Sequence, residues 1–195
     1  LAGGTFRTGS LRALKLYNYG SDAANPAMST STPTVYNGRA YVGVSGVGQF
    51  KAYSGHNITV IDLPSWRIAY TVRTQGYPQT SALLTTAYEA ETGYVCLYFF
   101  DNYTPGKLRM LRDKPGQTAP ETTEVETVVA GGKIVSYDTA PVLFTPSGAQ
   151  QQYAICSPIT DESGAIYFKN DSAYLMALTS TVTRLEIAAA PAKTV

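Results

Sequence analysis

Histidine-dependent nucleophilic catalysis could be built at only one place in this sequence, because the chain has a single histidine. A Ser-His-Asp or Cys-His arrangement would need His56, the one imidazole among 195 residues. His56 lies in Ser54-Gly55-His56-Asn57, a turn between two runs rich in β-forming residues. No nearby motif supplies a nucleophile or an orienting group. We therefore predict a histidine in a surface loop and no catalytic residue.

The two cysteines, Cys96 and Cys156, lie far apart in apolar segments that read as strands. Buried free thiols behave as small hydrophobic side chains, which is the interpretation we favour for both. A disulfide between them remains the alternative. Two cysteines are too few for a disulfide-based scaffold in a chain of this length.

Metal and phosphate chemistry find little support in the sequence. The tightest acidic group is Asp161-Glu162-Ser163-Gly164, and two carboxylates fall short of the roughly six to eight oxygens that calcium requires. This pattern favours a turn. The glycine-rich run 43–48 is followed by residues typical of a strand, whereas a phosphate loop needs a helix there. We predict no metal site and no cofactor.

Aromatic side chains are the remaining candidates for binding. The chain has 15 Tyr, 6 Phe and 1 Trp, and Tyr and Trp offer large, rigid, amphipathic contact surfaces. Trp66 and Tyr103 fall in predicted loops, where they could contact a carbohydrate or a protein partner. Most other tyrosines are expected to pack inside the protein.

The overall charge excludes one class of function. Lys and Arg number 15 and Asp and Glu number 14, for a net charge of +1, and only 15% of residues are charged, against about 25% in an average domain. A nucleic-acid binder that acts through a basic surface would carry a clear positive excess. No apolar run reaches the roughly 18 residues that a transmembrane helix needs. We expect neither a nucleic-acid partner nor a transmembrane segment.

An extracellular or cell-surface location fits the low charge and the abundant Ser, Thr and Tyr. Asn57-Ile58-Thr59 and Asn170-Asp171-Ser172 match the N-glycosylation pattern. The segment 188–195 is small and contains proline, so we predict that 1–187 form one domain and that 188–195 link it to a following one.

Repeated strand-and-turn units indicate an all-β fold. Residues 32–44 and 157–170 share a hydroxyl residue, a proline, a short strand, a turn with glycine and a second strand. Asn37-Gly38 is a strong signal for a hairpin with a type I′ turn. A weaker copy covers 81–100. Each unit is followed by a further predicted strand, or preceded by one at the start of the chain: 11–16, 58–62, 108–112 and 174–178.

The spacing of these units suggests four-stranded antiparallel sheets, about three to four in number. Thr32 and Ser81 are 49 residues apart and Ser81 and Ser157 are 76 apart, whereas a propeller blade takes about 40–50. We therefore expect an insertion or extra strands within 113–150. A β-sandwich is the alternative fold, and a helix over Ser81–Glu91 is an alternative local structure.

The segment Val60–Tyr70 resembles the tryptophan-docking motif of quinoprotein-like (pyrroloquinoline-quinone-type) β-propeller repeats. That motif reads Ala-x-Asp-x-x-Thr-Gly-Lys-x-x-Trp. Asp62 fills the Asp position and Tyr70 the Trp position, with Ser65 and Arg67 between them, while Trp66 replaces the glycine. The resemblance covers roughly 1–20, 30–113 and 140–180. It implies blades of a propeller, here as a partial ring.

The resemblance to the secreted and surface-protein branch of this family implies a non-catalytic binding or interaction scaffold. A fragment of a quinone-dependent dehydrogenase and a periplasmic assembly scaffold are the alternatives. Exposed sheet edges and faces are prone to association, so a homodimer that covers the end blades is a further expectation.

Overall fold

The computed structural model describes residues 11–19, 27–48, 51–121, 123–130, 132–179 and 193–194. Nearly all of its regular structure is β and the sheets are antiparallel apart from one parallel contact, which confirms the all-β prediction. In the described residues the helices are a single turn of α-helix, α1 (Glu89–Thr92), and a 3-10 turn, η1 (Gly148–Gln150).

The first sheet is an antiparallel meander in which each strand pairs with the next along the chain. Asn37 and Gly38 join its first two strands with φ values of 43° and 74°, as the predicted type I′ turn requires. Its strands are β1 (Thr34–Tyr36), β2 (Arg39–Val44), β3 (Asn57–Asp62) and β4 (Arg67–Arg73).

The second sheet has the order β10-β7-β6-β5. Its strands are β5 (Leu83–Thr85), β6 (Val95–Asp101), β7 (Lys107–Asp113) and β10 (Val142–Phe144). The alternative helix over 81–91 is wrong over its first half, because Leu83 and Leu84 alternate between two opposite faces of β5. Leu84 packs toward the first sheet and Leu83 toward the third, which is the period of a strand.

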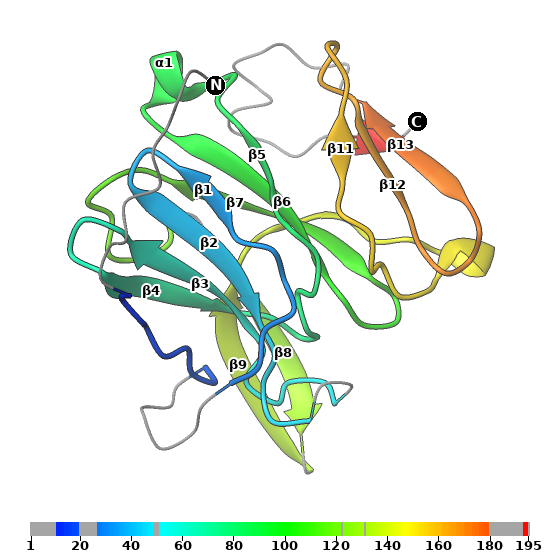
Figure 1. Cartoon of the computed structure of the whole chain (residues 1–195). Coiled ribbons are helices and arrows are strands. Elements are labelled where there is room, and N and C mark those ends of the chain that lie inside the picture. The colour runs from blue at the N-terminus through cyan, green and yellow to red at the C-terminus, as the bar shows by residue number, and fades with distance from the viewer. Residues whose placement is uncertain are drawn as a thin grey trace.

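A hairpin formed by β8 (Glu124–Ala130) and β9 (Lys133–Thr139) is inserted between β7 and β10. This confirms the expectation of extra strands within 113–150. One parallel pairing, Arg73 with Thr139, joins β9 to β4, so the first sheet formally continues as β1-β2-β3-β4-β9-β8. In Figure 1 the hairpin projects away from the stacked sheets.

The third sheet has the order β11-β12-β13-β14. Asp161 organises its first turn: one carboxylate oxygen accepts hydrogen bonds from the Ser163 and Ala165 N–H groups. Its strands are β11 (Ile159–Thr160), β12 (Ile166–Lys169), β13 (Leu175–Thr179) and β14 (Lys193–Thr194). β14 lies in the stretch 188–195 that the sequence suggested as a linker, so the sheet extends beyond residue 187. The rest of that stretch falls outside the described residues.

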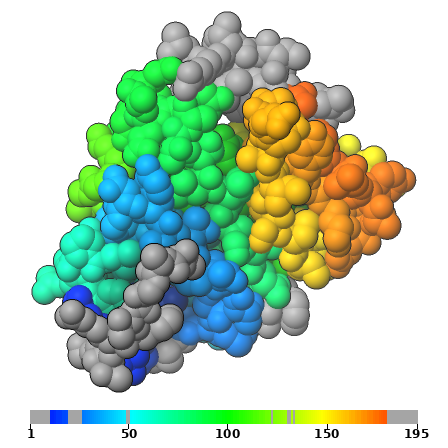
Figure 2. All heavy atoms as spheres, turned by 45° about the horizontal axis from the view of Figure 1, so that its top comes forward, coloured from blue at the N-terminus to red at the C-terminus, as the bar shows by residue number. Residues whose placement is uncertain are grey.

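The three sheets pack face to face in series, and the middle one is buried on both sides. Leu97 and Phe99 of β6 join a core with the first sheet, whereas Tyr98 and Phe100 join a core with the third. In Figure 2 the second sheet (green) lies between the first (blue and cyan) and the third (yellow to orange). Each pair of neighbouring sheets makes the face-to-face contact of a β-sandwich, and the molecule contains two such contacts.

The segment 11–16, predicted as a strand, is not one, and its apolar residues cover the outer face of the first sheet instead. Leu14 and Leu16 pack on a third core formed by Ala40, Val42, Val44 and Ile61. The chain nearby is held by backbone bonds from Tyr19 to Gly55 (2.8 Å) and from Ser45 to Met28 (2.8 Å). Leu14 and Leu16 therefore pack on the face of the first sheet, and the segment does not form the predicted strand.

Candidate functional site

One buried carboxylate, Asp113 at the end of β7, collects four hydrogen bonds from the first sheet. Arg39 donates through Nε and Nη2 to its two oxygens, at 3.0 and 3.2 Å. The hydroxyls of Tyr41 and Tyr70 donate at 2.8 and 2.7 Å. Burial, and then the nearby carboxylate, raises the pKa of both tyrosines, so they stay protonated donors. We call these four residues the Asp113 clamp.

Arg39 also ties the clamp to the adjacent turn. Its Nη2 donates to the carbonyl of Gln117 at 2.6 Å, and its Nη1 lies 3.7 Å from Asp62 Oδ1. Asp62 in turn accepts the N–H and hydroxyl of Ser65, and these bonds lower the pKa of its carboxyl. The residues of the docking-motif resemblance therefore lie around this clamp.

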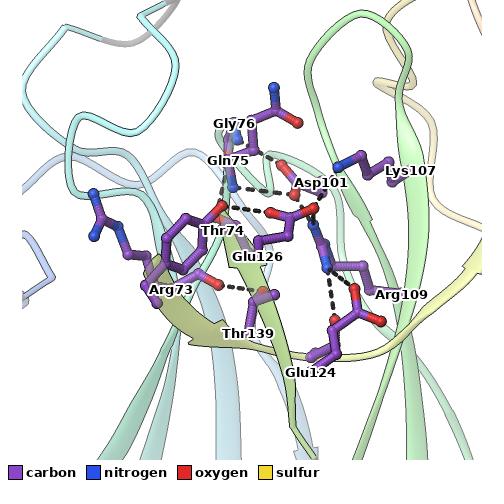
Figure 3. Close-up of polar contacts among 12 residues, drawn as sticks. Arg73, Thr74, Gln75, Gly76, Asp101, Lys107, Arg109, Glu124, Glu126 and Thr139 are labelled. Atoms are coloured by element: carbon purple, nitrogen blue, oxygen red, sulfur yellow. Dashed lines mark hydrogen bonds and ion pairs between the residues drawn. The ribbon is translucent and has the colours of Figure 1, made fainter. Parts of the chain in front are cut away.

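A second buried cluster lies at the opposite end of β6 and β7 (Figure 3). Arg109 Nε donates to Asp101 Oδ2 at 2.8 Å. Asp101 also accepts the N–H groups of Gln75 and Gly76, which follow β4 in the first sheet, at 3.0 and 2.5 Å. Like Asp113, this carboxylate joins the first two sheets, and we call it the Asp101 clamp.

The same arginine anchors the inserted hairpin. Arg109 Nη1 donates to the Ala140 carbonyl at 2.7 Å and contacts Glu124 at 3.1 Å, and Nη2 contacts Glu126 at 2.8 Å. Lys107 also pairs with Glu126. Burial alone would raise the pKa of Glu126, but Arg109 and its hydrogen-bonding neighbours outweigh burial and lower that pKa to about 2.

Both clamps are closed to solvent, which limits what they can do chemically. Arg39, Arg109, Asp101 and Asp113 are all buried, and every carboxylate oxygen of the two aspartates already accepts a hydrogen bond. A substrate would have to displace these bonds to reach the charges. The clamps are therefore structural ion pairs.

The outer face of the third sheet has the opposite character. Ile159 and Leu175 are 64% and 77% exposed, and strand register places Tyr167 and Ala177 on the same face. A hollow of about 190 Å³ opens here, lined by Cys156, Ser157, Ile159, Tyr167, Phe168, Lys169 and Leu175. The third sheet therefore exposes large apolar side chains on its outer face.

Trp66 is half-buried in the turn between β3 and β4. Its φ of 55° lies in the left-handed region, where glycine is the favoured residue. Trp66 therefore carries a large side chain at a backbone position that glycine usually occupies. The Arg12 guanidinium lies 5.1 Å from the ring centroid and covers part of its surface. Only part of the ring surface is therefore accessible to another molecule.

Tyr103 is also half-buried, but it lies in the β6–β7 turn next to the Asp101 clamp. Trp66 lies at the Asp113 end of the stack. Since β6 has seven residues and a strand rises about 3.3 Å per residue, the two ends are about 20 Å apart. The structure therefore does not bring the two predicted ligand-contact residues together.

His56 is fully buried, so the prediction of a surface-loop histidine is wrong. The loop folds back tightly: a Cβ added at Gly46 would lie 2.1 Å from the Ser54 carbonyl oxygen. Gly46 N–H donates to Nδ1 at 2.8 Å, so Nε2 carries the proton and donates to the Lys51 carbonyl at 2.9 Å. Burial lowers the pKa of His56.

This tautomer also excludes a Ser-His dyad. Ser54 Oγ lies 3.0 Å from His56 Nε2, which is the spacing of a nucleophile and its base. A protonated Nε2 cannot accept the hydroxyl proton. His56 therefore holds the loop in place as a neutral hydrogen-bonding group.

The glycosylation patterns are not usable in the folded protein. Asn57 and Asn170 are both buried, and their amides donate to the backbone carbonyls of Gly55 and Gln150. A glycan needs an exposed asparagine. Asp171 and Ser172 shape the turn after Asn170 instead.

The two cysteines are free thiols. Cys96 is buried in the core between the second and third sheets, as predicted, and burial raises the pKa of its thiol. Cys156 is only half-buried and lines the hollow on the outer face.

Sequence reasoning missed the clamp residues, although a signal was present. Arg109 lies between Leu108 and Met110, and Asp101 follows Phe99-Phe100. A charged residue within a strand that is apolar on both sides must be paired when it is buried. The charged residue within each apolar run therefore indicated a buried ion pair, but the residues that pair with it could not be identified from the sequence.

Within the described part of the chain, no group of three or more His, Cys, Asp or Glu is arranged to hold a metal ion. No helix there is both long and apolar enough to cross a membrane. Comparison with protein-family models and with curated protein sequences finds no match to this chain.

Proposed function

We propose that this chain forms part of a non-catalytic interaction scaffold of a secreted or cell-surface protein. Its stacked four-stranded sheets act as blades of a quinoprotein-like propeller, and the outer face of the third sheet is the contact surface. The observation that carries the proposal is the difference between the ends of the stack. Leu14 and Leu16 cover the outer face of the first sheet, whereas Ile159 and Leu175 stand exposed on the third.

The geometry around the docking-motif resemblance supports the propeller part of the proposal. Tyr70, in the position of the motif's tryptophan, packs between the first two sheets and reaches Asp113 with its hydroxyl. Asp62 caps its turn through Ser65. Trp66 adopts the left-handed φ that the motif's glycine would favour.

The partner that fits this face best is another four-stranded sheet, contributed by a second copy of the chain. Sheet faces already cover sheet faces twice in this molecule. Asp161 lies at one end of the third sheet and Lys169 at the other end of the same hairpin. A two-fold axis perpendicular to the strands would place the Asp161 end of one copy against the Lys169 end of the second.

Sedimentation velocity over a range of concentrations tests this proposal. We expect a dimer that grows with concentration and is abolished by Leu175→Glu, because the substitution would bury a charge between two apolar faces. Ile134→Glu is the matched control: Ile134 is 76% exposed, close to the 77% of Leu175, but lies on the hairpin.

A strictly monomeric wild-type protein would contradict the proposed partner. So would a dimer that Ile134→Glu disrupts and Leu175→Glu leaves intact, because the contact would then lie on the hairpin.

A further inference from the structure

A loop that contributes nothing to the apolar cores is held by the buried ring of His56. It joins β2 to β3, and we call its described residues, 46–48 and 51–55, the His56 loop. None of these residues belongs to the three apolar cores, and Val47 is 67% exposed. Segments with few buried apolar contacts can open while the rest of a protein stays folded. The His56 loop can therefore open without separating the sheets.

Protonation of the ring would remove the contact that closes this loop. Nδ1 accepts the Gly46 N–H at 2.8 Å, and Nε2 donates to the Lys51 carbonyl at 2.9 Å. A charged histidine carries a proton on both nitrogens, so Nδ1–H would face the Gly46 N–H, donor against donor. Gly46 has no room to move toward Ser54, because a Cβ added at Gly46 would lie 2.1 Å from the Ser54 carbonyl oxygen. The charged ring is therefore incompatible with the closed loop.

The groups around the ring compensate only weakly for a positive charge. The charged or titratable groups on the loop and on the elements packed around it are Tyr19, Lys51, Tyr53, Arg73, Tyr77 and Asp101. Asp101 is the carboxylate whose charge favours a protonated ring. Its oxygens already accept hydrogen bonds from Arg109 and from the N–H groups of Gln75 and Gly76. Opening of the loop, which returns the ring to water, is therefore the way to accommodate the charge.

Tyr53 connects the His56 loop to the β8–β9 hairpin. Its φ of 57° lies in the left-handed region, which is strained for a residue other than glycine. Two bonds hold it there: its N–H donates to the Gln75 carbonyl at 2.7 Å, and its carbonyl accepts from Arg73 at 3.2 Å. Its ring packs edge-on against Tyr137 of β9, with centroids 5.5 Å apart. Opening of the loop would relieve the strain and withdraw this ring from the hairpin.

We propose that protonation of His56 opens the His56 loop in mild acid and thereby loosens the β8–β9 hairpin. The closed loop holds Tyr53 against Tyr137, and the open loop does not. The ion pairs of Glu126 with Arg109 and Lys107 persist in this range, because the pKa of Glu126 is about 2. The hairpin therefore loses its contact with Tyr53 in mild acid and its ion pairs only in stronger acid.

The pH range follows from the two states of the ring. Burial lowers the pKa of His56 in the closed loop below the ordinary 6.5, whereas the open loop restores that ordinary value. The proton is therefore taken up preferentially by the open loop. The equilibrium constant for opening rises as the pH falls below 6.5, by up to about tenfold per pH unit.

NMR on the whole chain, labelled with ¹⁵N, tests the proposal between pH 7.5 and 5. The chain has one histidine, so the ring nitrogen signals report its tautomer and its protonation without ambiguity. Hydrogen exchange is measured at each pH and corrected for the intrinsic effect of pH on amide exchange. We expect a proton on Nε2 alone at pH 7.5. Exchange at Gly46 and Tyr53 should accelerate by up to about tenfold per pH unit below 6.5, while the amides of β3 keep their rates.

Three variants separate the steps. His56→Gln should remove the pH dependence of exchange in the loop and in the hairpin. Tyr53→Asn should keep it in the loop, because asparagine tolerates the left-handed region, but should raise hairpin exchange already at pH 7.5. Ser54→Ala is the matched control: it removes a hydroxyl 3.0 Å from Nε2 and leaves the contact of Nδ1 with Gly46, so the pH dependence should remain. If His56→Gln does not fold, the wild-type protein and Tyr53→Asn decide the question.

Four results would overturn the inference. They are a proton on Nδ1 at pH 7.5, loop exchange that does not respond to pH, equal acceleration in β3, and hairpin exchange that stays constant while the loop opens. Equal acceleration in β3 would mean that the first sheet opens as a whole.

Discussion

The two interfaces of the stack are built differently. Between the first and second sheets, an apolar core is flanked at each end by a buried aspartate of the second sheet, which accepts hydrogen bonds from the first sheet or from the residues that follow it. Between the second and third sheets the core is also apolar, but the described residues show no ion pair across it. Its polar links are single bonds, such as Ala154 N–H to Asn102 Oδ1 at 3.0 Å.

The buried ion pairs determine the orientation of one sheet on another, whereas apolar packing alone holds two sheets together without fixing their orientation. Apolar faces attract each other in many orientations, whereas a buried carboxylate that loses its donors is penalised strongly. The two clamps therefore fix how the first sheet sits on the second. The third sheet is held mainly by packing, and it exposes Ile159 and Leu175 on its outer face.

The largest expected effect comes from breaking the better-defined interface. Asp113→Ala leaves Arg39, Tyr41 and Tyr70 buried without their acceptor, and should reduce the free energy of unfolding by about 3–5 kcal/mol. Urea denaturation measures it.

Asp161→Ala is the control for Asp113→Ala, because Asp161 also accepts a tyrosine hydroxyl, that of Tyr167 at 2.8 Å, but is exposed. It should lower the free energy of unfolding by much less than Asp113→Ala does, because water can replace the lost hydrogen bonds at an exposed site. Equal losses for the two variants would refute the distinction between buried clamp and exposed turn.

Acid should weaken the ion pairs of Glu126 with Arg109 and Lys107, which hold the β8–β9 hairpin. The apolar core between the second and third sheets should not respond to the same change of pH. The pKa of Glu126 is about 2 in the folded protein against an ordinary 4.5. Its contribution is complete above pH 4.5 and is lost as the pH falls toward 2. Allowing for partial exposure, the loss is about 1–2 kcal/mol. Thermal unfolding of Glu126→Gln should show a flatter pH dependence in this window.

His56 acts in the same direction at higher pH. Its lowered pKa means that the unfolded chain takes up a proton first, so stability is complete above pH 6.5 and declines below it. His56→Gln should remove this decline between pH 6.5 and 5. A wild-type melting temperature that stays constant from pH 7 to 5 would contradict the buried neutral histidine.

A smaller effect should distinguish the two apolar cores. Phe168→Leu, in the core shared with the third sheet, should cost about 1 kcal/mol. Hydrogen exchange should then accelerate in β12 and β13 while β2–β4 keep their protection. The matched variant Phe99→Leu, in the other core, should accelerate exchange across the first two sheets. A uniform response to both would show that the sheets unfold as one unit.

Local features of the fold could be predicted from the sequence, and long-range partners could not. Asn37-Gly38 determines its turn by backbone preference alone, and the doubly apolar run in β6 indicates burial on both faces. Arg39 and Asp113 are 74 residues apart, and no local rule connects them. The buried state of His56 likewise depends on how its loop folds onto Gly46.

The candidate surfaces were also beyond sequence reasoning. Trp66 and Tyr103 were selected as loop aromatics, but exposure of the third sheet depends on what happens to cover each face. The alternating leucines Leu14 and Leu16 read as a strand, and only the structure places them over the first sheet.

Thiol reactivity on opposite faces of β6 tests the serial stack most directly. In a Cys156→Ser background, native Cys96 faces the third sheet, and Leu97→Cys in a Cys96→Ser chain faces the first. We predict that each thiol reacts with Ellman's reagent only when the sheet that covers it opens, and therefore slowly, while Ile159→Cys on the outer face, in a chain without the native cysteines, reacts at once. Rapid reaction at position 96 or 97 in the native protein would show that β6 is covered on one face only and would contradict the serial stack.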